Sequence, residues 1–240
     1  MPTLEELLEV GAHFGHKASR WNPKMAPYIF TTRNKFHIID LDKTSEKLKA
    51  AADFVASIVK SGGSVLFVGT KRQGKPIIKK YAASVGMPFV AERWLGGTLT
   101  NFKTIQRSIK KLATLEERLA AEDAGKYTKK ERLMMEREVA KSNILFEGLR
   151  AFKKLPEAVF VLDTITDKIA VAEARVTGVP VIGIVDTNSD PSDVDYVIPA
   201  NDDAIKTLDL ITKTISEAAS AGRAQAAEKD EAVVKENNAK

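Results

Sequence analysis

The sequence predicts an α/β protein with a flavodoxin-like, mostly parallel sheet between helical layers. The first observation is a pair of short apolar runs without alternation, residues 65–68 and 159–162, which is typical of parallel strands buried on both faces. The second is the rhythm that follows each run: a stretch with helical periodicity, a glycine, and another apolar run. Strands that alternate with helices of this length indicate βαβ units.

The amino-terminal region should begin with a short helix. Thr3 and Glu6 form a capping-box pattern, and Gly11 is placed to end the helix. Residues 12–35 are expected to be irregular and basic, since Pro23 and Pro27 prevent regular helix.

A hairpin and a helix come next. Residues 28–30 and 36–39 are strand-like and flank Thr32-Arg33-Asn34, which is typical of a turn. Residues 44–61 have helical periodicity, and Gly62-Gly63 should stop that helix.

The sheet is expected to be built from two similar units and a closing helix. The predicted elements are the strand 65–68, the helix 76–85, the strand 89–90, the strand 159–162, the helix 168–176, the strand 181–185 and the helix 202–218.

Residues 101–150 interrupt this rhythm because they carry no strand signal. Apolar residues recur at helical spacing in both halves, and Asp123-Ala124-Gly125 should be a turn between them. We therefore expect an inserted antiparallel helical hairpin of coiled-coil type; charged flanks favour a projecting hairpin over two helices lying flat on the sheet. The expected apolar seam consists of Ile105, Ile109, Leu112, Leu115, Leu119, Met135, Val139, Phe146 and Leu149.

These elements divide the chain into three parts. Residues 1–100 and 151–218 should form the α/β sheet domain, and residues 101–150 the inserted hairpin. Residues 219–240 are small, charged or amide-bearing, so we expect a disordered tail.

Bulk composition favours a soluble cytoplasmic protein. The chain has no cysteine, which excludes disulfides and thiolate metal sites. Its apolar runs are shorter than the roughly 18 residues that a membrane span needs, and its first residues are acidic, unlike a signal peptide.

Charge is strongly segregated along the chain. Residues 10–115 hold 19 Lys and Arg against 5 Asp and Glu, a balance of +14, whereas the whole chain carries only +5. A polyanion partner explains such segregation better than a surface of mixed charges, because each neutralised phosphate releases counterions and adds affinity. We therefore expect a nucleic-acid partner.

The segment FVGTKRQGKP, residues 67–76, contains G-x-x-x-x-G-K and raises the alternative of an NTPase. A P-loop places Ser or Thr after its lysine, because that hydroxyl binds the magnesium ion of the nucleotide. This chain has Pro76 there, which has neither a hydroxyl nor an N–H. The segment is better interpreted as a basic loop at the carboxyl end of a strand, where phosphate of a polynucleotide could bind, or as a solvated turn.

The sequence His13-Phe14-Gly15-His16 lies in a basic, aromatic-rich stretch. It fits an RNA-contacting arm, where rings stack and basic groups bind phosphate, or plain packing of the aromatic rings. A metal site that joins His13 and His16 to Asp186 or Asp190 is a third alternative that the sequence leaves open. The acidic loop 185–195 is expected to face solvent or a basic protein.

We predict no catalytic residues, no resident metal and no cofactor, because no nucleophile–base constellation or paired carboxylates can be assembled from the chain. The expected RNA-contacting residues are basic side chains of the acid-poor half and one tryptophan. They are Lys17, Arg20, Trp21, Lys24, Arg33, Lys35, Lys71, Arg72, Lys75, Arg93, Lys103, Arg107, Lys110 and Lys111.

Several long segments, in order, resemble the bacterial ribosomal protein S2 family of the small subunit. They are EELLEVGAHFGHK from Glu5, RWNPKMAPYIF from Arg20, FVGTKRQGK from Phe67, RWLGGTLTNF from Arg93, PEAVFVLD from Pro156 and GIVDTNSDPSDVDYVIPANDDA from Gly183. The resemblance covers residues 3 to about 218.

The resemblance implies more than the composition does. It implies a flavodoxin-like sheet with an inserted α-hairpin and a protein without catalytic activity or nucleotide substrate. It also implies binding to small-subunit ribosomal RNA near the junction of head and body. A further implied role is to help dock neighbouring ribosomal proteins, among them the large OB-fold protein that captures messenger RNA. A protein-docking role for the hairpin or the acidic loop is compatible with RNA binding.

Overall fold

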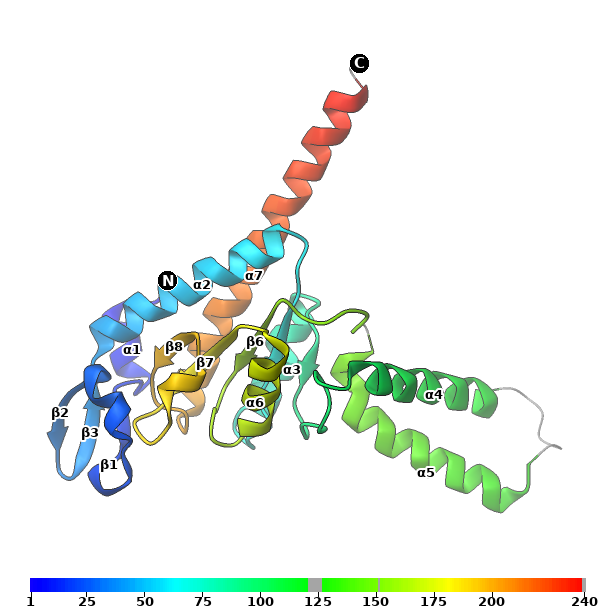
Figure 1. Ribbon diagram of the computed structural model, residues 1–240, viewed down its shortest axis with the longest axis horizontal. Helices are drawn as coiled ribbons and strands as arrows, with labels where there is room; N and C mark the ends of the chain where they lie inside the picture. The colour runs from blue at the N-terminus through cyan, green and yellow to red at the C-terminus, as the bar shows by residue number, and fades with distance from the viewer. Residues whose placement is uncertain (121–126, 151, 239–240) are drawn as a thin grey trace.

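The computed structural model describes residues 1–120, 127–150 and 152–238, with side chains to residue 226. A five-stranded sheet occupies the centre, a small three-stranded sheet lies at one end, and two long helices extend at the other (Figure 1). None of the helices in these ranges is long and apolar enough to cross a bilayer.

The central sheet is parallel throughout its described pairings. Its strands are β4 (Val65–Val68), β5 (Phe89–Val90), β6 (Ala158–Val161), β7 (Val181–Val185) and β8 (Tyr196–Pro199). Their spatial order is β5-β4-β6-β7-β8, the 2-1-3-4-5 order of flavodoxin-like folds. The predicted fold class is confirmed to this extent.

A hydrophobic core lies on each face of the sheet. On one face α2 (Leu41–Lys60), α3 (Lys75–Ser84) and α7 (Ile205–Asn238) cover Phe67, Phe160 and Ile182. On the other face α6 (Lys168–Thr177) packs on the alternate residues of the same strands, such as Val159 and Val161. The strands lack polar alternation because both faces are covered.

The amino-terminal region is more regular than the sequence predicts. Helix α1 (Leu4–Glu9) has both halves of the predicted capping box. The predicted hairpin is present as β2 (Ile29–Arg33) and β3 (Phe36–Ile39), with Asn34 and Lys35 at positive φ in its turn. An unpredicted strand, β1 (Phe14–Lys17), pairs with β3. Two 3-10 helices, η1 (Ala18–Arg20) and η2 (Pro23–Tyr28), join β1 to β2, where we expected irregular chain.

Two boundaries of the sheet domain differ from the prediction. Strand β8 was not predicted, because residues 196–199 stand alone within a polar, turn-rich stretch. Helix α7 continues to Asn238, so the backbone of residues 219–238 is helical where we expected disorder. Its alanines, glutamates and lysines have high helix propensity, and Gly222 packs against the carbonyl of Ala56 on α2.

Between β5 and β6 the chain forms helices α4 (Phe102–Ala120) and α5 (Lys129–Phe146), followed by the 3-10 helix η3 (Glu147–Leu149). The two helices lie side by side and extend away from the sheet (Figure 1). All nine residues of the expected apolar seam are buried or half-buried. The expected turn Asp123-Ala124-Gly125 lies outside the described residues.

Candidate nucleic-acid interface

The loop that resembles a P-loop begins where β4 ends, and its lysine Lys71 turns inward. The Lys71 ammonium lies 2.7 Å from Asp203 Oδ1, 2.9 Å from Asp202 Oδ1 and 3.2 Å from Asp163 Oδ2. Asp163 follows β6 and Asp202 follows β8, so the carboxyl edge of the sheet brings these groups together. Lys71 is therefore the centre of an internal ion cluster.

Titration in this cluster is strongly perturbed. Burial lowers the pKa of Lys71, but hydrogen bonds to Asp203 and Asp202 outweigh it, so the net pKa is raised. Burial, together with the charges of Asp163 and Asp186, raises the pKa of Asp202 to about 7. Burial also raises the pKa of Asp163, but bonds from Thr166 and the charge of Lys71 bring it below its ordinary value.

The backbone donors of this loop are also used internally. Asp167 accepts from both the N–H and the hydroxyl of Thr70, at 3.1 and 2.7 Å. The Gly69 N–H donates to Val90, and the N–H groups of Gly74 and Lys75 donate to the Lys71 carbonyl. A P-loop needs such amides free to surround phosphate. Here protein groups fill the crevice between β4 and β6 where a flavodoxin-like fold binds its ligand.

Lys75, the lysine of the G-x-x-x-x-G-K pattern, also has a protein partner. Its ammonium lies 2.7 Å from Glu92, which Lys79 contacts as well at 3.1 Å. Lys79 extends this network to Glu147 at 2.8 Å. Glu92, the single acid between residues 54 and 115, thus links α3 to the segment after β5.

A second polar network joins the small sheet to the central sheet. The His16 N–H donates to Thr187 Oγ1 at 2.8 Å, and His16 Nδ1 lies 3.1 Å from Asp186 Oδ2. Gly15 permits this approach, because a Cβ there would lie 2.6 Å from the Thr187 methyl group. The bond to Asp186 raises the pKa of His16 despite partial burial.

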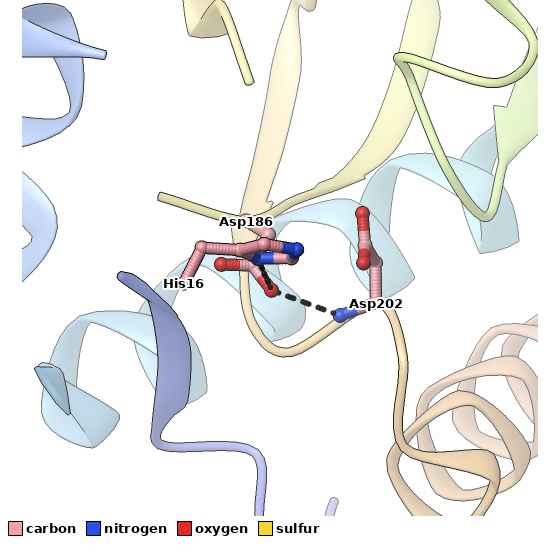
Figure 2. A group of neighbouring side chains, drawn as sticks. All are labelled: His16, Asp186 and Asp202. Carbon is pink, nitrogen blue, oxygen red and sulfur yellow. Dashed lines mark hydrogen bonds and ion pairs between the residues drawn. The ribbon is translucent and has the colours of Figure 1, made fainter. Parts of the chain in front are cut away.

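The acidic loop after β7 was expected to face solvent or a basic protein, and solvent exposure is wrong for its first half. Asp186, Thr187 and Ser189 are buried; Thr187 contacts His16 of the amino-terminal region, as does Asp186 (Figure 2). Farther along, Asp190 pairs with Lys24 at 2.8 Å, and this bond lowers the pKa of Asp190 to about 2. In the sequence, only the metal-site alternative joined the basic arm to the acidic loop, and the ion pair between Lys24 and Asp190 was not predicted.

Glu173 on α6 organises the segment between β5 and α4. Its carboxylate accepts from Trp94 Nε1, from the N–H groups of Gly97, Leu99 and Thr100, and from the Thr100 hydroxyl, at 2.7–3.1 Å. Burial raises the pKa of Glu173, but these bonds reverse the shift and leave it lowered. Sequence reasoning did not identify Glu173, because its partners lie more than seventy residues away.

The remaining predicted RNA-contacting residues lie at the surface in separate groups. One group is on the small sheet and its connections: Lys17, Arg20, Trp21, Lys24, Arg33 and Lys35, all exposed. Within it, Trp21 packs beside the His37 ring at 5.0 Å between centroids, and Lys17 lies 6.0 Å from the Phe36 ring. The group thus combines aromatic faces with cations, as single-stranded RNA recognition requires.

The second group is on α4, where Lys103, Arg107, Lys110 and Lys111 are exposed. Lys111 is paired with Glu138 of α5 at 2.7 Å. Arg72 and Arg93 lie exposed on loops at the carboxyl ends of β4 and β5. The small sheet and α4 are at opposite ends of the central sheet (Figure 1), so the structure does not gather the predicted residues into one site.

These features define a parallel α/β protein whose P-loop-like turn is an internal ion cluster and whose predicted RNA-contacting cations lie mostly on the small sheet and α4. The model of the family described as ribosomal protein S2 matches residues 7–222. The chain belongs to the ribosomal protein S2 family.

Curated relatives agree with this assignment. The chain is 48% identical over 223 residues to the small ribosomal subunit protein uS2 of Solidesulfovibrio magneticus, covering 93% of this chain and 86% of the relative. It is 49% identical over 216 residues to the small ribosomal subunit protein uS2 of Geotalea uraniireducens, covering 90% and 84%. The resemblance noted in the sequence is confirmed.

Proposed function

We propose that this protein is a cytoplasmic structural constituent of the small ribosomal subunit that binds ribosomal RNA without chemically altering it. Family membership over residues 7–222 carries the proposal. It is supported by the exposed basic residues of the small sheet and of α4, which can neutralise phosphates of two RNA segments at once. The RNA segments would be those near the junction of head and body.

Lys71 is the one predicted RNA contact that we do not carry into this interface. Its ammonium already contacts three carboxylates, so a phosphate would have to displace partners that are mostly buried. The same contacts, with the internal bonds of the loop amides, argue against nucleotide hydrolysis. Lys75 is retained as a weaker candidate for an RNA contact, because its ammonium is already paired with Glu92.

The second part of the proposal concerns protein partners. Helices α4 and α5 would form a coiled-coil hairpin, and α1 with β2 would help to dock the large OB-fold ribosomal protein. Leu4, Leu8 and Phe30 are exposed apolar side chains there and line a cavity of about 350 Å³. Exposed apolar surface of this kind is typical of protein interaction sites.

Charge reversal tests the RNA part. The variant Arg33→Glu/Lys35→Glu changes the small sheet, and Lys103→Glu/Arg107→Glu changes α4. Each should weaken binding to small-subunit RNA and flatten the dependence of log K on log salt, by a slope of about 0.7–0.9 for each lost phosphate contact. Filter binding at several salt concentrations and co-sedimentation with small subunits provide the measurements.

A matched control is Lys206→Glu/Lys213→Glu on α7, which has the same charge change outside the basic half and should bind as the unmodified protein does. If the two test variants and this control had the same dependence of log K on log salt, the proposed interface would be contradicted. In the same co-sedimentation, Phe30→Ser should retain RNA binding and lose the OB-fold protein; unchanged recovery of that protein would remove the docking role from this face. Saturable ATP binding with magnesium would revive the NTPase alternative.

A further inference from the structure

Helix α6 is apolar on two sides. Its inner side packs Ala170, Val171 and Ala174 into the core on one face of the central sheet. On its outer side Ile169 and Val176 are 54% and 78% exposed. A helix at the surface of a globular protein normally presents charged or polar side chains outward, so these two aliphatic side chains lie where polar groups are expected.

The outer aliphatic side chains form one stripe. Ile165, in the turn before the helix, is followed by Ile169, Ala172 and Val176 at spacings of four, three and four residues, which places them along one side of α6. All four are exposed. Helix α2, on the opposite face of the sheet, differs because its exposed residues are charged or small: Asp42, Glu46, Lys49, Ala50, Asp53, Ser57 and Lys60.

A groove follows this stripe. Figure 1 shows α6 in front of the central strands, with no other helix drawn over it. A cavity of about 490 Å³ lies along the helix and is lined by Lys168, Ile169, Ala172, Glu173 and Val176. Both carboxylate oxygens of Glu173 already accept hydrogen bonds from the segment after β5. The groove therefore offers an incoming partner mainly alkyl groups and one cation, Lys168.

Such a groove selects a protein helix as its occupant. The backbone groups of the interior of α6 are bonded within the helix, so they offer an extended strand nothing to pair with. A partner backbone buried here must satisfy its own hydrogen bonds, as a helix does. RNA fits poorly, because its sugars and phosphates would meet aliphatic side chains and the Glu173 carboxylate, with Lys168 as the one cation in the lining.

The charges beside the stripe define the partner further. The exposed charged residues of α6 are Lys168 and Arg175, and its one acid, Glu173, is buried. Arg175 pairs with Asp193, whereas Lys168 has no ion-pair partner among the described residues. In a two-fold contact between two copies of α6, the cations of one copy would face those of the other, and such like-charge contacts are unfavourable. An acidic partner, by contrast, complements Lys168.

We propose that the outer face of α6 binds an amphipathic helix of a neighbouring small-subunit protein, with an aliphatic stripe against α6 and a carboxylate against Lys168. The inference rests on the proposed function, since it takes the partner to be a component of the small subunit. It concerns a different face from the one formed by α1 and β2.

Photo-crosslinking within small subunits isolated from cells identifies the occupant. One variant carries p-benzoylphenylalanine in place of Ala172, and the matched control carries it in place of Ala50, which is exposed on α2. Mass spectrometry should show position 172 linked to one protein helix with aliphatic residues at i, i+3 or i+4 and i+7 and an Asp or Glu at one end. Position 50 should not give that product. A link to ribosomal RNA, to a second copy or to a segment without this pattern, or no link at all, would each overturn the proposal.

Binding to small subunits stripped of this protein measures what the stripe contributes. Ile169→Asp/Val176→Asp should raise the Kd at least about tenfold, because it places charge in an apolar contact, and Lys168→Glu should also raise it. The control Ala50→Asp/Ser57→Asp adds the same charges at the same seven-residue spacing on α2 and should bind as the unmodified protein does.

Folding and function are controlled separately. All the substituted side chains are exposed, so urea denaturation should give similar stabilities; if the double variant unfolds, Val176→Asp alone takes its place. Failure of the unmodified protein to bind stripped subunits would contradict the proposed function. Equal Kd values for the stripe variant and the α2 control, with the unmodified protein bound, would contradict this inference alone.

Discussion

At the residue scale, Lys71 lies within the P-loop-like segment, but its side chain contacts carboxylates of the protein itself. Its charge compensates carboxylates that follow two different strands, β6 and β8. Removing one partner of a buried ion pair leaves the other uncompensated, and this costs more than the pair contributes.

We therefore expect Lys71→Met to lower the free energy of unfolding by about 3–5 kcal/mol. Adding Asp202→Asn should recover part of the loss, because the second change removes one of the carboxylates left without a cation. Urea denaturation of the single and double variants forms the thermodynamic cycle. A double variant that loses the sum of the two single losses would show that these groups are not coupled.

Glu173 offers a second residue-scale prediction, on pH. Its folded-state pKa is lowered, so its stabilisation is complete above the unfolded value of about 4.3 and is lost as pH falls through the folded pKa. Glu173→Gln should cost about 2–3 kcal/mol at pH 7, since an amide cannot accept all the bonds that the carboxylate accepts.

The measurement is urea denaturation between neutral pH and pH 3. The stability difference between the unmodified protein and Glu173→Gln should shrink as pH falls below about 4. Glu217→Gln, an exposed acid on α7, serves as the control and should change stability little. A difference that stays constant with pH would refute an ionised Glu173 as the acceptor.

Residue types alone could predict only part of the candidate site. The expected RNA-contacting residues were chosen from the acid-poor half of the chain, and all of them except Lys71 and Lys75 are exposed, as charged groups usually are. Which cations turn inward could not be predicted. Lys71 and Arg72 are neighbours in sequence, but Lys71 is half-buried and Arg72 is exposed. That choice depends on carboxylates about 90 to 130 residues away, which sequence spacing does not reveal.

At the element scale, strands buried on both faces were the easiest to predict. Strands β4 and β7 have the predicted bounds. Their nearly continuous apolar residues are typical of a strand that is covered on both faces, so the ends of the apolar run mark the ends of the strand. Strands β1 and β8 were missed because each is short and depends on partners: β1 pairs with β3, and β8 adds to the edge of β7. Edge strands take their conformation from the sheet more than from their own residues.

The contact between η3 and β5 gives an element-scale prediction. A Cβ on Gly148 would lie 2.2 Å from the Phe89 carbonyl oxygen, which belongs to the backbone and cannot easily move. Gly148→Ala should therefore destabilise the protein by about 3 kcal/mol, as overpacking does. Thermal unfolding can measure this against Gly96→Ala, whose added methyl meets open space. Equal melting temperatures would mean that η3 shifts away freely.

At the scale of the whole molecule, most of the predicted RNA-contacting cations form two groups, on the small sheet and on α4, while Arg72 and Arg93 lie on loops of the central sheet. A folded polyanion that contacts both must come to two ends of the central sheet. Segregation along the sequence predicted a polyanion partner but not this division, because the basic half of the chain supplies both the small sheet and α4.

The division makes the two groups energetically independent. Combining Arg33→Glu/Lys35→Glu with Lys103→Glu/Arg107→Glu should give a loss of RNA-binding free energy equal to the sum of the two separate losses, within about 0.5 kcal/mol. The salt slope should fall by the sum as well. The four-substitution protein in the same filter-binding series checks this. A combined loss no larger than that of one variant would mean that a single group binds RNA.

The two tryptophans of the chain lie in contrasting places, and this provides an optical handle. Trp94 is buried with its indole nitrogen bonded to Glu173, whereas Trp21 is exposed on the connection from β1 to β2. The fluorescence emission of Trp94 should change when the protein unfolds, and the emission of Trp21 should be quenched when RNA bases bind near it. In the variant Trp21→Phe, Trp94 would be the remaining tryptophan, so the emission would report unfolding of the interior without a contribution from RNA binding. Comparing this variant with the unmodified protein separates the rate of folding from the rate of RNA binding.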